Sequence, residues 1–166
     1  MSKWILRAIL LVAIVVIGVL GWKHFSPNPE AQIRSALVDL AKTASFTSSE
    51  SKISKISATQ KLLDRCTPDI EIGVDVPGFA HQTLSGKDEL KQTALVVRYQ
   101  LSALSVEFLD ITIALAPDKQ SAVVNLTAKI RVPSEREFIP QELKFTMNQV
   151  DGKWLIRKIE TVRTLQ

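Results

Sequence analysis

The sequence predicts an N-terminal transmembrane helix followed by an α+β domain, in which three helices pack on a curved, mainly antiparallel β-sheet. Three observations predict this class. An apolar run opens the chain, apolar residues recur at helical spacing in much of the first half after it, and apolar–polar alternation is prominent in the second half. Helices grouped against one face of an antiparallel sheet define the α+β class.

The composition describes one folded domain, because 46% of the 166 residues are hydrophobic and 23% are charged. The net charge of +4 arises mainly beside the apolar run, at Lys3, Arg7 and Lys23. Without these three, 18 of the 21 basic residues remain against 17 acidic ones. We therefore expect no nucleic-acid partner.

The single cysteine, Cys66, excludes an intramolecular disulfide and a Cys-rich zinc site. A lone cysteine near the end of an apolar segment is typical of a small buried hydrophobic residue. His24 and His81 share no short metal-binding spacing. We expect neither a metal site nor a cofactor.

The apolar run extends from Trp4 to Trp22 and would span about 28 Å as a helix, close to the ~30 Å hydrocarbon core of a bilayer. Arg7 lies near its end, where a long side chain reaches the headgroups. A cleaved signal peptide is the alternative, but "GWKHFSPN" lacks the small residues that precede a cleavage site. We expect residues 4–22 to contact membrane lipid as a retained anchor.

The basic residues around this run set its expected orientation. Lys3, Arg7 and the α-amine lie at its start and Lys23 at its end, so the positive-inside rule favours a cytoplasmic N-terminus. For a bacterial chain the domain would then be periplasmic, tethered to the inner membrane. The expected division is residues 1–24 as anchor, 25–29 as linker and 30–166 as domain.

Two helices are expected before the first strand. Asn28, Pro29 and Glu30 fit an N-cap, a first helical residue and a first-turn acid. Apolar residues at helical spacing follow until "SFTSSES", residues 45–51, interrupts them. Weaker periodicity indicates a second helix that ends near Cys66, before "TPD".

A short strand and a loop are expected in "IEIGVDVPGF", residues 70–79. Ser85 with Asp88 three residues later resembles a capping box at the start of a third helix. One apolar face over four turns predicts that helix, formed by Leu90, Ala94, Val97, Leu101 and Leu104.

The rest of the chain is predicted as strands. "VEFLDITIAL", residues 106–115, has a β-rich composition. "SAVVNLTAKIRV" alternates apolar and polar residues, as does an antiparallel strand with one buried face. Pro133 and Pro140 bracket a connection to the closing hairpin.

The closing hairpin is predicted by Asp151-Gly152, since Asp tolerates and Gly readily adopts the positive φ of a two-residue turn. Beyond the turn, Ile159 is out of phase with Trp154 and Ile156. A bulge near Arg157 would restore the phase.

The ordered set of elements resembles the nuclear transport factor 2-like superfamily, which includes SnoaL-like cyclases and ketosteroid isomerase-like proteins. The resemblance covers roughly residues 30–165 and rests on "LSGKDELKQTAL", "PDKQSAVVNLTAKIRV" and the closing "VDGKWLIRKIE". It implies a cone, in which a curved sheet wraps around three helices, often with a pocket in the mouth. Trp154 would help to plug or line such a cone.

Isomerases of this superfamily use a carboxylate base and acidic donors in an apolar pocket, where burial raises the pKa of a carboxyl group. The weak candidates here are Asp110, in mid-strand, and Tyr99, on the third helix, while Asp75 and His81 lie on the preceding loop. None matches a family motif in register, so no catalytic residue is carried over. Each is better explained as an exposed strand residue, a helix residue with its ring packed or an ordinary loop residue.

Two groups of residues are candidates for core and binding roles. Those expected to line a pocket or fill the core are Phe108, Phe145, Met147, Trp154 and Ile156. Those expected to form a basic outward face of the late strands are Lys129, Arg131, Lys144, Lys153 and Arg157. The basic face would be either a solvated surface or a contact for an acidic partner or anionic headgroups.

Three functions remain open. We favour a single-pass membrane protein whose domain binds an envelope protein, a second copy of itself or a small apolar ligand, without catalysis. The alternatives are an isomerase- or cyclase-like enzyme, and a subunit of an envelope assembly similar to the inner-membrane bridge proteins of type IV secretion. Two titratable groups converging in a deep pocket would favour the enzyme, and an apolar exposed sheet face would favour the assembly.

Overall fold

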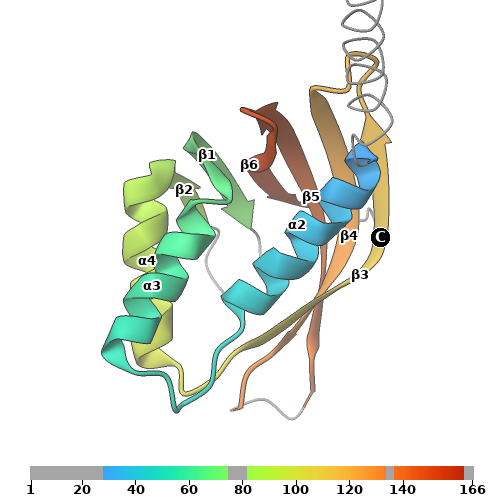
Figure 1. The fold of residues 1–166 in the computed structure, drawn as a ribbon. Helices are drawn as coiled ribbons and strands as arrows, with labels where there is room; N and C mark the ends of the chain where they lie inside the picture. Colours follow the sequence, from blue (N-terminus) through green and yellow to red (C-terminus); the bar gives the residue numbers. More distant parts are fainter. Residues whose placement is uncertain (1–27, 75–81, 134–136, 163–166) are drawn as a thin grey trace, which may run out of the picture.

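The computed structural model describes residues 28–74, 82–133 and 137–162, and within them three helices pack on a curved six-stranded sheet (Figure 1). The predicted α+β class is confirmed. The elements are α2 Pro29–Ala44, α3 Lys52–Leu63, β1 Cys66–Val74, β2 Gln82–Ser85, α4 Gly86–Gln100, β3 Ser105–Leu115, β4 Ser121–Arg131, β5 Ile139–Val150 and β6 Lys153–Thr161.

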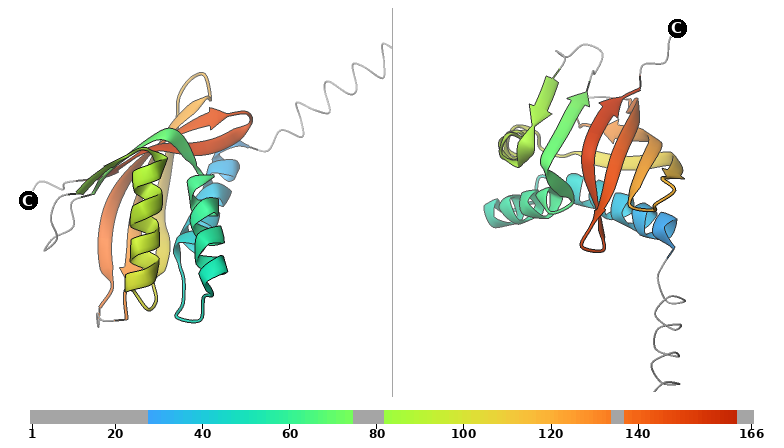
Figure 2. Two further views of the ribbon diagram at one scale, coloured as in Figure 1. Left: turned by 90° about the vertical axis from the view of Figure 1, so that its left-hand side faces the viewer. Right: turned by 90° about the horizontal axis from the view of Figure 1, so that it is seen from above.

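The strands follow the order β2-β1-β6-β5-β4-β3, and all neighbours are antiparallel except β1 and β6. The sheet is therefore mixed, with β3 to β6 as a meander. Figure 2 shows it curving around the helices. Irregular pairing on β1, β3 and β6 accompanies this curvature, because a bulge bends its strand.

The hairpin turn and the bulge are both confirmed. Asp151 and Gly152 have φ of 50° and 77°, the pair of positive values that a type I′ turn requires. In β6, Ile156 pairs with Met147 and Lys158 with Thr146, which leaves Arg157 as the extra residue. The bulge returns Ile159 to the apolar face.

The core lies between α2 and the inward face of the sheet. Its residues on α2 recur at helical spacing, and those on β4 and β5 alternate, as the sequence predicts. The buried hydrophobic cluster is Ile33, Ala36, Leu37, Leu40, Leu63, Cys66, Ile70, Leu90, Ala122, Val124, Leu126, Ala128, Leu143, Phe145, Met147, Trp154 and Ile156.

The helix starts agree with the sequence in part. Asn28 caps α2, because its side chain accepts a hydrogen bond of 3.1 Å from the Glu30 amide. At α4 the Ser85 side chain forms no capping bond, and Glu89 instead of Asp88 accepts from the Ser85 amide at 2.7 Å. The predicted capping box is therefore wrong in both halves, since Ser85 makes no side-chain cap and the carboxylate one residue after Asp88 reaches the amide.

Three boundaries also differ from the sequence prediction. The second helix ends at Leu63, and Cys66 begins β1. Residues 82–85, for which the sequence predicted no strand, form β2 because they pair with β1. Pro140, expected in a connection, lies inside β5, where it is paired with Lys129.

The third predicted helix is shorter than its apolar pattern. It ends at Gln100, and Leu104 instead forms a β-bridge with Phe46. The predicted anchor, residues 4–22, and Pro77-Gly78 lie outside the described residues. Among the helices of the described ranges, none has the length and apolar character needed to cross a membrane.

Candidate functional site

Two adjoining cavities of about 390 and 360 Å³ lie between α2, the end of α3 and the start of β6. Arg65, Lys153 and Trp154 line both of them, and together we name them the hairpin groove. The other lining residues are Ala31, Gln32, Ser35, Ala36, Asp39, Lys42, Thr43, Lys61, Asp64, Gly152 and Leu155.

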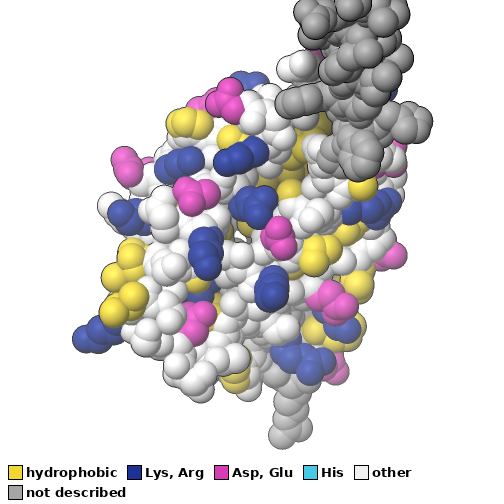
Figure 3. Space-filling view, in the orientation of Figure 1, with side chains coloured by type: hydrophobic (Ala, Val, Ile, Leu, Met, Phe, Trp, Pro, Cys, Tyr) yellow, Lys and Arg dark blue, Asp and Glu magenta, His cyan; other side chains and the backbone are white. Residues whose placement is uncertain are grey.

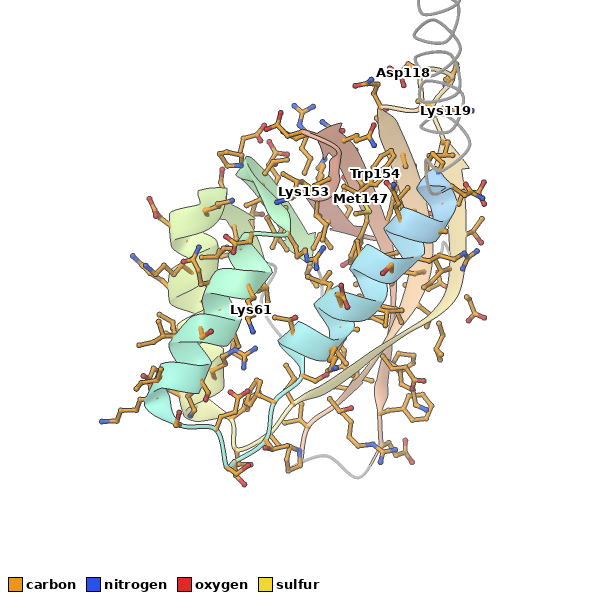
Figure 4. The ribbon with its side chains drawn as sticks, viewed as in Figure 1. Lys61, Asp118, Lys119, Met147, Lys153 and Trp154 are labelled. Atoms are coloured by element: carbon orange, nitrogen blue, oxygen red, sulfur yellow. The ribbon has the colours of Figure 1, made fainter. Side chains whose placement is uncertain are left out.

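The hairpin turn places the side chains at the base of this groove. Lys153 follows the type I′ turn directly and stays exposed, whereas Trp154 points to the core. Figure 4 shows these two residues between β1 and the first turns of α2, with Lys61 on the side of α3 that faces α2. The groove therefore joins residues far apart in the sequence.

The groove has an excess of positive charge. Arg65 Nη2 and Asp39 Oδ2 form an ion pair of 3.0 Å, and Asp64 accepts a hydrogen bond of 3.1 Å from Gln60. In contrast, the lysines at positions 42, 61 and 153 form no ion pair with another described residue. Figure 3 shows several basic side chains on the face where α2 and α3 lie, with fewer acidic ones among them.

Trp154 supplies a buried donor beside these cations. Its side chain is in the core, with 3% of the residue exposed. Its indole Nε1 has no acceptor among the described residues. Buried N–H groups are nearly always paired, so this one requires an explanation.

The residues predicted to line a pocket or fill the core lie in or against the core, and Trp154 also lines the hairpin groove. Phe108 and Phe145 pack edge to face, with ring centroids 5.7 Å apart. Phe145 and Met147 are each 1% exposed, and Ile156 is buried beside them. Together, the side chains of this set therefore occupy the interior of the cone.

The two weak catalytic candidates do not converge. Tyr99, on α4, is 53% exposed, and the ammonium of Lys55 on α3 lies 4.9 Å from its ring centroid. Asp110 is exposed at the irregularity of β3, with φ of 52°. Helix α4 packs on β1 and β2, at the opposite edge of the sheet from β3. Asp75 and His81 lie outside the described residues.

The predicted basic face carries both signs of charge. Lys129 approaches Glu107 at 3.9 Å, and Lys144 approaches Glu160 at 3.8 Å, both across neighbouring strands. Arg157, on the bulge, lies 3.5 Å from Asp69. The Lys158 ammonium donates a hydrogen bond to the Glu160 carboxylate. This bond lowers the pKa of Glu160 and raises the pKa of Lys158. Two further residues were predicted for the basic face. Arg131 is exposed and lines a separate cavity, and Lys153 lines the hairpin groove.

Arg98 is a buried cation that the sequence prediction did not identify. Its guanidinium donates to Glu50 at 2.9 Å and to the Thr43 carbonyl, and it lies 4.9 Å from the Phe46 ring centroid. These four residues are named the Arg98 cluster. The sequence does contain a signal for this burial. Leu90, Ala94 and Arg98 are each four residues apart, which places all three on one face of the helix.

Cys66 is a buried thiol, as its position beside an apolar segment predicts. Burial raises its pKa to about 11, because a thiolate is costly in an apolar environment. Within the described ranges, no three His, Cys, Asp or Glu side chains come together as a metal site would require.

Structural comparison identifies the class of fold. No family model matches the chain, and no curated protein matches its sequence. An NTF2-like protein of unknown function from Pseudomonas putida KT2440 superposes with a TM-score of 0.62 and 11% identity, over 82% of this chain and 87% of that one. A protein of unknown function with a cystatin-like fold from Nostoc punctiforme PCC 73102 gives 0.59 and 14%, over 82% and 92%.

A third solved structure comes from Novosphingobium aromaticivorans DSM 12444 and is named provisionally as a scytalone dehydratase. It superposes with a TM-score of 0.60 and 18% identity, over 82% of this chain and 84% of that one. The domain therefore has the nuclear transport factor 2-like fold, which confirms the resemblance seen in the sequence. At these identities the likeness shows the fold alone.

Proposed function

We propose that this chain is a membrane-tethered binding protein. Residues 4–22 anchor it in the inner membrane with the N-terminus in the cytoplasm, and its nuclear transport factor 2-like domain binds a ligand or partner in the periplasm without catalysis. The sequence supports the anchor through its length, its flanking charges and its tryptophans.

The packing of the cone is the observation that carries the binding role. Phe108, Phe145, Met147 and Ile156 occupy the interior where related folds often hold a pocket. The hairpin groove lies beside this interior and is lined mainly by polar side chains, with Trp154 and Ala36 as apolar surface. A ligand would therefore contact the groove, and the separated Tyr99 and Asp110 would take no part.

Protease treatment of spheroplasts tests the tether and its orientation. Before treatment the full chain should fractionate with membranes, and added protease should then digest the domain. A mature soluble form that begins near Ser26 would refute the anchor, and protection of the domain would refute the orientation.

An isomerisation assay tests the absence of catalysis. A β,γ-unsaturated ketone should convert at the same rate with the chain as in buffer. A faster conversion that is lost in Asp110→Asn or Tyr99→Phe would establish the enzyme alternative instead.

A further inference from the structure

The lysines of the hairpin groove lack the glutamate neighbours that the lysines on the outer face of the sheet have. Lys129 and Lys144, on the outer face of the sheet, each lie near a glutamate on the neighbouring strand. Lys42, Lys61 and Lys153 come from α2, α3 and β6 to the groove, and no described carboxylate forms an ion pair with them. The same cavity also holds the carboxylates of Asp39 and Asp64, so its four basic and two acidic side chains leave an excess of positive charge, which an anion would relieve.

We propose that the hairpin groove binds a small organic anion, a carboxylate or phosphate monoester with a compact apolar body. This inference rests on the proposed binding function and names the class of ligand for the same site. Lys42, Lys61 and Lys153 provide the attraction, while Arg65 is already held by Asp39.

Trp154 gives the groove an apolar floor. It lines both cavities, and its Nε1 is a buried donor with no acceptor among the described residues. This N–H is enclosed in the core, so Trp154 serves the groove through its ring and not as a hydrogen-bond donor. The indole ring and Ala36 provide apolar surface for the rest of the ligand.

The size of the groove limits the ligand. Cavities of about 390 and 360 Å³ lie at the lower end of the range of roughly 300–1,000 Å³ for ligand sites. This volume suits a single small ring or short chain. A segment of folded protein would need a larger contact surface.

Carboxylates near the groove favour a soluble anion over an anionic bilayer surface. Glu30 lies in the first turn of α2, where the chain arrives from the predicted anchor. Asp151 lies in the hairpin turn, and Figure 2 shows that turn at the same end of the domain as the start of α2. Both carboxylates would repel anionic headgroups at that end.

Isothermal titration calorimetry of the full-length chain in a neutral detergent tests the proposal. The probes are cyclohexanecarboxylate, cyclohexyl phosphate and the neutral isostere cyclohexanecarboxamide. Both anions should bind saturably with Kd below about 1 mM, and the carboxamide should bind at least about tenfold more weakly, as expected if one charge-assisted contact is lost.

Matched variants locate the binding. Lys61→Ala and Lys153→Ala should each weaken anion binding by about three- to tenfold, whereas Lys52→Ala, exposed at the other end of α3, should change it less than about twofold. An unchanged thermal unfolding midpoint serves as the folding control for each variant.

Three outcomes would overturn the proposal: no saturable binding of either anion, equal binding of the carboxamide, or equal losses in Lys52→Ala and Lys61→Ala. None of these outcomes bears on the tethered, non-catalytic role, which the protease and isomerisation tests decide.

Discussion

The sheet and the α3–α4 pair hold their places by different means. On β4 and β5 every second residue faces inward, and side chains such as Val124 and Phe145 are almost completely buried. On α3, Ile53 is 80% exposed and Ile56 is also exposed, while α4 buries the charged Arg98. The sheet therefore depends on many apolar contacts, whereas the helical pair combines two buried leucines, Leu63 and Leu90, with the polar contacts of the Arg98 cluster.

This difference predicts different sensitivities to mutation. Loss of an apolar side chain from the sheet leaves a cavity that close packing cannot refill. Loss of a polar partner in the Arg98 cluster leaves a buried group without its hydrogen bonds, which costs its full desolvation energy. Most other positions on the outer side of α3 and α4 should tolerate change.

The largest effect is expected at Trp154. Trp154→Ala should lower the free energy of unfolding by about 3–5 kcal/mol, because it removes a large buried ring from the core. Denaturant unfolding of the separately produced domain, residues 28–166, would measure it. Lys153→Ala, the exposed neighbour, is the control and should stay within about 0.5 kcal/mol. Equal midpoints for Trp154→Ala and the unmodified domain would contradict the packed interior.

Arg98 tests the polar side of the comparison. Arg98→Met should cost about 3 kcal/mol, since Glu50 loses its partner and the Thr43 carbonyl loses its donor. Arg65→Met is the matched control, because its ion pair with Asp39 is exposed and should be worth no more than about 1 kcal/mol. Similar losses for the two variants would show that burial of Arg98 is not what holds α4 in place.

The buried thiol predicts a loss of stability at alkaline pH. The pKa of Cys66 rises from 9.0 to about 11 on folding, so the unfolded chain loses this proton first. Stability should be unaffected by this group below about pH 9 and should fall by about 3 kcal/mol as the pH passes through 11. Comparison of unfolding curves with those of Cys66→Ala isolates the effect, and identical pH dependence would exclude it.

The smallest effect is expected on the exposed side of α3. Ile53→Ser should change the free energy of unfolding by less than about 0.5 kcal/mol, because the side chain is already in water. Ile33→Ala, fully buried on α2, should cost about 2–5 kcal/mol under the same conditions. A large loss in Ile53→Ser would mean that this face is covered, for example by a second copy of the chain.

The sequence by itself determined the features that arise from local sterics and periodicity. Asn28 caps α2, the residues of β4 alternate, Asp151-Gly152 forms the turn, and β6 has its bulge at Arg157. Each depends on backbone preferences of neighbouring residues, or on a period of two or 3.6 that keeps apolar groups on one face. The order of these elements was enough to indicate the fold.

Only the tertiary structure decided the features that join distant segments. β2 is a strand because β1 pairs with it, and β1 runs parallel to β6 at the far end of the chain. Glu107 and Glu160 change the predicted basic face because strand register places them beside lysines. The hairpin groove likewise draws its lysines from three elements, since non-local packing, which no local pattern encodes, sets which side chains share a surface.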